Sequence, residues 1–243
     1  MKRMMMGMLM GMLSWIPVAS VAEEVAGGEA ARGLSGVVTV GYDSRYVLYG
    51  FRLSRHLWHA DVYLHYPVSE RTSLWGGSWF GYLTDGTYRE VDGYVGVDHA
   101  VNSWLTLGVA YSIFNYIEVP FEASRQAHEV AVHATVAEGP WSFSLRTHYD
   151  TDADGYLVRG IGGYYTSLTD RVGLDVGAEA GYSLRYFTPG TDWNHGLVAV
   201  KAPVAVGGGV VATPFVARSI PLSAIRDFEV YETVWGVSMS WGF

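Results

Sequence analysis

Large apolar residues occupy every second position over most of the chain. Between Leu105 and Ile113, the residues Leu107, Val109 and Tyr111 alternate with Thr, Gly, Ala and Ser. Successive side chains of a β-strand point to opposite faces, so such a segment has one apolar and one polar side. No comparable stretch follows the 3.6-residue period of a helix. The pattern therefore predicts an all-β protein.

About twelve segments show this alternation, and each is near the roughly 9–11 residues that a tilted strand needs to cross the hydrocarbon of a bilayer. They cover residues 36–45, 55–66, 71–83, 88–100, 103–116, 125–137, 140–150, 156–168, 171–186, 194–204, 209–220 and 230–243.

The connections between these segments alternate between short and long. Tight turns are expected at Ser69-Glu70, Val101-Asn102, Glu138-Gly139, Thr169-Asp170 and Gly207-Gly208. Longer links are expected at residues 46–54, 84–87, 117–124, 151–155, 187–193 and 221–229. Outer-membrane barrels have short turns at one end and longer loops at the other. In hydrocarbon every backbone N–H and C=O must pair within the protein, so the sheet is expected to close. The predicted fold is a transmembrane antiparallel β-barrel of about twelve strands.

The last residues of the chain alternate up to a terminal aromatic residue. Trp241 and Phe243 end a strand that resembles the terminal signature by which outer-membrane barrels are recognised and inserted. We therefore expect these two residues to form an insertion signal for the barrel-assembly machinery. The alternative is an ordinary edge strand that ends in Phe by chance.

The first residues have the pattern of a secretory signal peptide. Lys2 and Arg3 precede a short apolar run, and small residues lead to Ala22. The expected organisation is a signal peptide over 1–22, a short periplasmic lead over 23–34 and an outer-membrane β-barrel over 35–243. An uncleaved anchor is the alternative. No second apolar run of helical membrane length follows, which argues against a helical membrane protein.

Composition is consistent with a membrane barrel and excludes some other classes. The chain has 17 Tyr, 9 Trp, 30 Gly and no Cys, so disulfides and cysteine metal sites are excluded. Tyr and Trp favour the interface between hydrocarbon and lipid headgroups. The formal charge of −8, or −10 without Lys2 and Arg3, makes nucleic acid an unfavourable partner. The expected partners are the outer-membrane bilayer and small solutes.

Charged residues of both signs recur on the face opposite the apolar one. We predict that the charged residues of this face line a pore, together with His59, His65, His133 and His148. The predicted pore-lining residues are Asp43, Arg45, Asp61, Glu90, Asp92, Asp98, Glu129, Arg146, Arg159, Asp175, Glu179, Arg185 and Lys201. A soluble lipocalin-like barrel would have apolar residues inside and charges outside. Mixed charges inside a narrow barrel are expected to pair across the lumen, and a transition-metal site is the alternative.

Three acidic residues form a weak candidate metal site. Asp150, Asp152 and Asp154 precede Gly155 at the spacing of the first half of a calcium loop, but Ile161 stands where the distal Glu would be needed. A solvated hairpin turn is the preferred interpretation.

The sequence contains only part of the residues that two kinds of barrel enzyme require. His148 and Asp150 lie two residues apart, as in an omptin-type protease pair, but no second acidic pair is evident in the sequence. No His is followed two residues later by Ser, which argues against a lipase of the outer-membrane phospholipase type. We therefore expect no enzymatic activity and no cofactor.

The segment Gly41-Tyr42-Asp43-Ser44-Arg45-Tyr46, followed by Tyr49-Gly50-Phe51-Arg52-Leu53-Ser54, resembles the start of the TorF-type porins. That family opens its barrel with a strand containing Tyr and Arg and an Arg-Gly-x-Ser loop, whereas here the Gly precedes the Arg. The resemblance covers about residues 38–58 and implies passive passage of small solutes.

The sequence thus predicts a small porin in the outer membrane. If the lumen conducts, its acidic excess predicts a mild preference for cations. The alternatives are a structural outer-membrane protein with a filled lumen, a barrel enzyme, and a soluble periplasmic β-protein.

Overall fold

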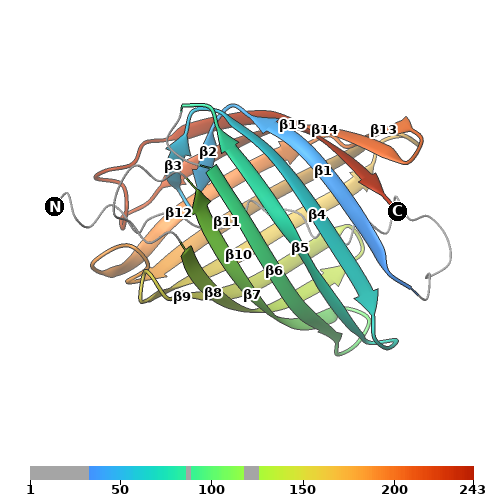
Figure 1. The fold of residues 1–243 in the computed structure, drawn as a ribbon, viewed down its shortest axis with the longest axis horizontal. Coiled ribbons are helices and arrows are strands. Elements are labelled where there is room, and N and C mark those ends of the chain that lie inside the picture. The colour runs from blue at the N-terminus through green and yellow to red at the C-terminus, as the bar shows by residue number, and fades with distance from the viewer. Residues whose placement is uncertain (1–32, 86–88, 118–125) are drawn as a thin grey trace.

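The computed structural model describes residues 33–85, 89–117 and 126–243. The predicted signal peptide and nearly all of the periplasmic lead lie outside these residues. The described part is built from β-strands, which form a barrel (Figure 1). None of its residues forms a helix long and apolar enough to cross a membrane.

The barrel wall consists of twelve strands. They are β1 (Ser35–Asp43), β4 (Leu57–Pro67), β5 (Thr72–Leu83), β6 (Arg89–Ala100), β7 (Leu105–Ile117), β8 (Gln126–Glu138), β9 (Trp141–Asp150), β10 (Gly155–Ser167), β11 (Gly173–Leu184), β12 (Thr191–Lys201), β14 (Val210–Pro221) and β15 (Glu232–Gly242). Three short strands complete the fold: β2 (Tyr46–Leu48), β3 (Phe51–Ser54) and β13 (Val204–Gly207).

The wall closes between the first and last strands. Neighbouring strands are antiparallel in the order β12-β11-β10-β9-β8-β7-β6-β5-β4-β1-β15-β14, and β14 pairs with β12. At the seam, Val37 to Asp43 pair with Gly242 to Gly236. The terminal Phe243 continues this pairing, because it exchanges backbone hydrogen bonds of 2.9 and 3.0 Å with Gly36. The described wall therefore has no free strand edge, as a membrane barrel requires.

The predicted strands agree closely with the observed wall, and two differences have physical reasons. Residues 46–54, predicted as a plain loop, form the β2–β3 hairpin. The predicted strand at 194–204 is interrupted at Ala202 and Pro203, because Pro has no N–H to donate to a ladder. β12 ends there, and the chain resumes as β13, which extends the hairpin with β14 beyond the wall at the end of the barrel that holds the C-terminus (Figure 1).

The two faces of the wall differ as the alternation predicts. Outward residues such as Val95 and Val132 expose about half of their surface, at 52% and 53%. Their inward neighbours include buried charged residues such as Glu90 and Glu129. An apolar outer surface around a polar interior is the arrangement of a barrel that sits in a bilayer.

Candidate functional site: the barrel lumen

The lumen is occupied in one half by the β2–β3 hairpin. Tyr49 and Gly50 join its strands with φ angles of 47° and 88°, as the two central residues of a type I′ turn require. Tyr46, Leu48 and Phe51 are at most 3% exposed, although they lie between two wall strands in sequence. The hairpin therefore folds inward rather than projecting into solvent.

Inside the barrel, the hairpin packs against both sides of the wall. Tyr46, Leu48, Tyr49 and Phe51 belong to one apolar cluster with inward residues of the wall and with two loop residues. These other buried members are Leu57, Trp79, Leu83, Phe114, Tyr116, Ala127, Leu157, Tyr186 and Ile225. Val47 packs on the other side in a cluster with Ala199, Ala217 and Val234 of β12, β14 and β15. The hairpin thus spans the lumen from one wall to the other.

The turn at the tip of the hairpin requires glycine at position 50 and holds the preceding Tyr49 in a left-handed conformation. A Cβ on Gly50 would lie 2.6 Å from Ile225 and 2.7 Å from His195. A left-handed conformation costs a non-glycine residue such as Tyr49 about 1–2 kcal/mol. Asn194 donates a 2.7 Å hydrogen bond to the Tyr49 carbonyl, and the Arg159 guanidinium lies 4.7 Å from the Tyr49 ring centre. These contacts hold the turn in place.

A layer of buried charged side chains lies against the hairpin tip. Arg159 donates two hydrogen bonds to Glu179, at 2.6 and 2.7 Å, and His195 lies 2.8 Å from the same carboxylate. His148 lies 2.8 Å from Glu129 and 3.4 Å from Arg159. These residues come from β8 to β12, so the layer ties five neighbouring strands together. Such a network favours one arrangement of the interior because removing a member leaves a buried charge without a partner.

The hairpin is also fastened to β15 by ion pairs. Glu232 accepts hydrogen bonds from Arg45 at 2.9 Å and from Arg52 at 2.8 Å. The backbone N–H of Arg52 donates to Glu229 at 3.2 Å. We call Arg45, Arg52, Glu229 and Glu232 the latch. The latch joins the hairpin to the end of the β14–β15 loop.

Burial keeps the interior phenols neutral. It raises the pKa of Tyr49 and of Tyr186 above the ordinary value of a phenol, because the charged form would lose its hydration. The nearby Glu129 carboxylate adds to this effect in both cases. Burial likewise raises the pKa of Glu229 in the latch. Tyr49 at the hairpin tip and Tyr186 beside it therefore present neutral rings, and not anions, to the charged layer.

The rest of the inner wall has local pairs of polar side chains. Tyr94 donates a 2.8 Å hydrogen bond to Asp61, and His133 lies 3.1 Å from Asp98. Further pairs are His59 with Asp43 at 3.7 Å and Lys201 with Asp175 at 3.8 Å. Arg146 stands directly opposite Arg159 on the neighbouring strand.

The predicted pore-lining residues occupy different places. Eleven of the thirteen lie on wall strands at inward positions: Asp43, Asp61, Glu90, Asp92, Asp98, Glu129, Arg146, Arg159, Asp175, Glu179 and Lys201. Arg45 belongs to the latch, between β1 and β2. Arg185 lies in the β11–β12 loop with an exposed side chain and a φ of 62°. The sequence pattern did not predict the hairpin, and the local signal for it is weak, since Gly50 interrupts an apolar run but Tyr49-Gly50 is not a typical hairpin dipeptide.

His148 and Asp150, the candidate protease pair, are buried. Glu90 and Asp92 lie two residues apart on β6 and form an acidic pair on the inner wall, in addition to the His148 and Asp150 pair. With Asp150 and His148, they are at most 5% exposed. His148 is engaged with Glu129, and the Tyr46 hydroxyl lies 3.4 Å from Glu90. A peptide substrate would not reach these groups with the hairpin in place.

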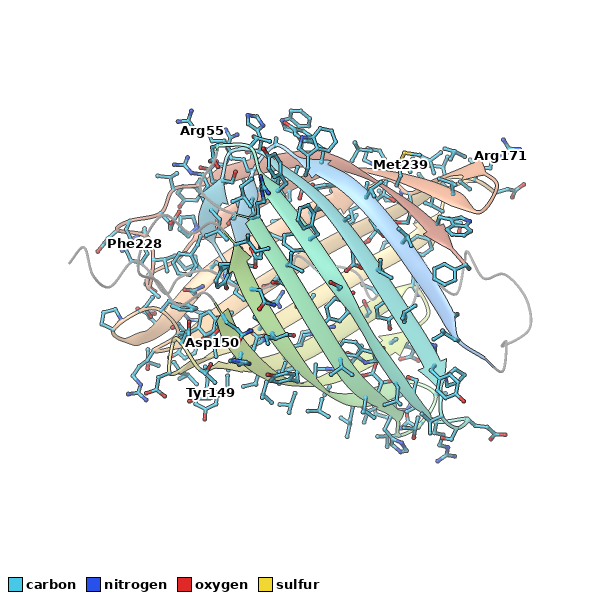
Figure 2. All side chains as sticks on the ribbon, in the orientation of Figure 1. Arg55, Tyr149, Asp150, Arg171, Phe228 and Met239 are labelled. Atoms are coloured by element: carbon cyan, nitrogen blue, oxygen red, sulfur yellow. The ribbon has the colours of Figure 1, made fainter. Side chains whose placement is uncertain are left out.

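The residues of the weak calcium candidate form a turn. The Asp150 carboxylate accepts hydrogen bonds of 2.8 Å from the backbone N–H groups of Asp152 and Ala153, and Asp154 accepts one from Tyr149 at 3.1 Å. Figure 2 shows Tyr149 and Asp150 at the looped end of the barrel. In the described part of the chain, no group of three or more His, Asp and Glu side chains could hold a metal ion.

The residues of the predicted insertion signal lie together at the seam. The rings of Trp241 and Phe243 are 5.5 Å apart, and each side chain is about half exposed. Trp241 belongs to β15, which pairs with β1 and β14, and Phe243 directly follows that strand and pairs with Gly36.

The closed wall, apolar outside and polar inside, defines an outer-membrane β-barrel. No protein-family model matches the sequence, and no curated protein matches it. Several solved structures share the fold. The COG4313 outer membrane channel from Pseudomonas putida F1 superposes with a TM-score of 0.56 at 12% identity, over 89% of this chain and 97% of that one.

Two further structures are similar to about the same degree. The KdgM porin in complex with disordered oligogalacturonate gives a TM-score of 0.53 at 12% identity, over 86% of this chain and 99% of that one. The translocator domain of the autotransporter NalP from Neisseria meningitidis gives 0.53 at 12% identity, over 93% and 92%. The three have different roles, so the likeness shows the fold, and function must be argued from the lumen.

Proposed function

We propose that the protein is an outer-membrane porin through which small polar solutes diffuse, and that the β2–β3 hairpin is its constriction. Two observations support this function. The inner wall carries polar and charged side chains, which water and small solutes tolerate. Structures with the same fold include a porin and an outer membrane channel.

The hairpin is the observation on which the proposal depends most. It spans the lumen and is fastened at one point to β15 and at its tip to the charged layer. It is also held by packing and by the Tyr46 hydroxyl, which lies 3.4 Å from Glu90. None of these contacts belongs to the backbone pairing of the wall strands, so the hairpin can leave the lumen without breaking the wall. Solute passage then follows displacement of the hairpin. The pore is proposed to be lined by the inward charged residues of the wall, and Arg45 of the latch lies at its mouth.

We also propose a family for the protein and a route by which it is exported and inserted. The resemblance to TorF-type porins falls on the end of β1 and on the hairpin, and we include membership of that family in the proposal. Export by a signal peptide over 1–22, and recognition of Trp241 and Phe243 by the barrel-assembly machinery, also belong to it. Deletion of Phe243, which would remove the last backbone pairing with Gly36, is expected to lower insertion sharply.

The second candidate is a structural outer-membrane protein with a filled lumen. The apolar cluster around the hairpin favours it, because thirteen buried residues among those the structure describes fill that half of the barrel. The two candidates differ in whether the hairpin ever leaves its place.

Single-channel recording on the refolded protein tests the proposed function. We expect brief openings of small conductance separated by long closures. During openings potassium should pass more readily than chloride, because acidic residues exceed basic ones on the inner wall. Complete absence of openings in protein shown to be inserted would favour the structural role. Selectivity for chloride would contradict the lining proposed above.

A further inference from the structure

The lipid-facing surface of the barrel carries positive charge at one end. In the described strands, Arg89 of β6 and Arg218 of β14 face outward. Arg89 precedes the inward Glu90, and Arg218 lies between the buried Ala217 and Ser219. Both arginines lie near the looped end of their strands. Their outward neighbours along the strands are apolar, so a guanidinium there requires an explanation.

Each arginine rests on an outward tyrosine. The guanidinium of Arg89 lies 5.4 Å from the ring centre of Tyr82, and that of Arg218 lies 5.5 Å from the ring centre of Tyr231. Arg218 also donates a 2.5 Å hydrogen bond to the hydroxyl of Thr233. These contacts place the guanidinium groups beside tyrosine rings on the outer face. The hydrogen bond to Thr233 uses one of the five N–H donors of Arg218.

Aromatic residues connect the two arginines around the barrel. Arg89, Tyr82, Trp58 and Tyr42 stand directly opposite one another on β6, β5, β4 and β1. The Tyr42 ring lies 5.8 Å from that of Trp235 on β15, which is the neighbour of β14. The arginines therefore stand at the two ends of one arc over six adjacent strands. We call these residues, with Tyr231 and Thr233, the basic arc.

The chemistry of the basic arc matches a phosphate in the membrane interface. Tyr and Trp occupy the level where hydrocarbon meets headgroups. A guanidinium at that level gains most from an anionic partner, and its planar donors fit phosphate oxygens in pairs. No ion pair joins Arg218 to a carboxylate in the described residues. For Arg218 an anionic partner is then expected from outside the described residues, and at this depth lipid headgroups are available anions.

We propose that the basic arc binds the phosphate groups of a phosphorylated glycolipid in the outer leaflet. The end of the barrel supports this choice of leaflet. The arc lies at the looped end, opposite the C-terminus and the short turns, and barrels of this class direct their longer loops outward from the cell. The charged outward side chain at the other end of the described strands is an acidic one, Glu138.

Native mass spectrometry of lipid binding tests this site. The refolded protein is mixed with lipid A carrying two phosphates, with the dephosphorylated lipid, or with lipid A in excess inorganic phosphate. The variants are Arg218→Gln alone and the pair Arg89→Gln with Arg218→Gln. Arg171→Gln is the matched control, because Arg171 is exposed in the β10–β11 turn at the opposite end (Figure 2). Heat-modifiable migration on a detergent gel verifies that each variant is folded.

The expected result is a preference for the phosphorylated lipid and about tenfold weaker binding by the double variant, equivalent to about 1.4 kcal/mol. Arg218→Gln alone should give an intermediate loss, and Arg171→Gln none. Excess inorganic phosphate should not displace the lipid. Equal binding by the double variant, equal binding of the dephosphorylated lipid, or displacement by free phosphate would each overturn the proposal. None of these outcomes depends on conduction, so the proposed lipid site can be disproved without disproving the proposed porin function, and the reverse also holds.

Discussion

At the scale of single residues, the structure of the interior depends on a few residues whose close surroundings make substitution destabilising. Gly50 is one, because its positive φ coincides with close packing against Ile225 and His195. Glu179 is another, because it neutralises Arg159 and contacts His195 within a buried layer. Sequence alone could place Glu179 on an inward face. It could not show which cation it meets, because the partner comes from another strand.

Gly50→Ala should loosen the hairpin. Alanine at this position keeps the left-handed backbone and adds a methyl group that overlaps Ile225 and His195, and overpacking of this kind costs about 1–3 kcal/mol. Gly139→Ala is the control, because Gly139 has a φ of 55° and open space around its Cβ position. Urea unfolding followed by tryptophan fluorescence should show a larger decrease in the free energy of unfolding for Gly50→Ala than for Gly139→Ala. Equal losses would mean that packing at the tip is unimportant.

Glu179→Gln should destabilise the barrel strongly. The change leaves Arg159 as a buried cation without its carboxylate, and such a loss typically costs about 3–5 kcal/mol. Asp175→Asn is the matched comparison on the same strand, since its partner Lys201 is 3.8 Å away and Asp175 is more exposed. The same assay should give a much lower free energy of unfolding for Glu179→Gln than for Asp175→Asn. A reversed order would contradict the role given to the charged layer.

At the scale of elements, the alternating pattern located the wall strands because each has one face toward lipid. In β7, for example, the outward residues from Leu105 to Ile113 are apolar or aromatic, and in β8 those from Val130 to Val136 are apolar. The run Val47, Leu48, Tyr49 gives no such signal. The hairpin is buried on both faces inside the lumen, so apolar residues occupy consecutive positions and the period of two is lost. Its place in the fold depends on contacts with distant strands, which no local pattern records.

Glu232→Gln should release the hairpin from β15. Both arginines of the latch would lose a charged acceptor, and opening of the hairpin would become more frequent. Limited digestion with trypsin measures this directly, since Arg45 and Arg52 are its cleavage sites. We expect about tenfold faster cleavage than in the wild type, as a loss of about 1.4 kcal/mol would give. Glu70→Gln, in an exposed turn at the other end, should change nothing. Unaltered cleavage at Arg52 in Glu232→Gln would show that packing alone retains the hairpin.

At the scale of the whole molecule, closure of the wall satisfies the backbone in the bilayer, and the interior decides function. The same wall could surround an open channel or a sealed core. In this chain one half of the lumen contains an apolar cluster built around the hairpin, and the remaining inner wall is polar. On the function proposed above, the hairpin therefore controls whether solute passes.

Replacing Tyr46–Ser54 by a short Gly-Ser linker tests that claim most directly. The variant and the wild type are refolded, shown to be heat-modifiable, and recorded side by side as single channels in the same bilayer. The account predicts that the variant conducts steadily, with a larger conductance than the brief openings of the wild type. A folded and inserted variant that conducts no more than the wild type would contradict it.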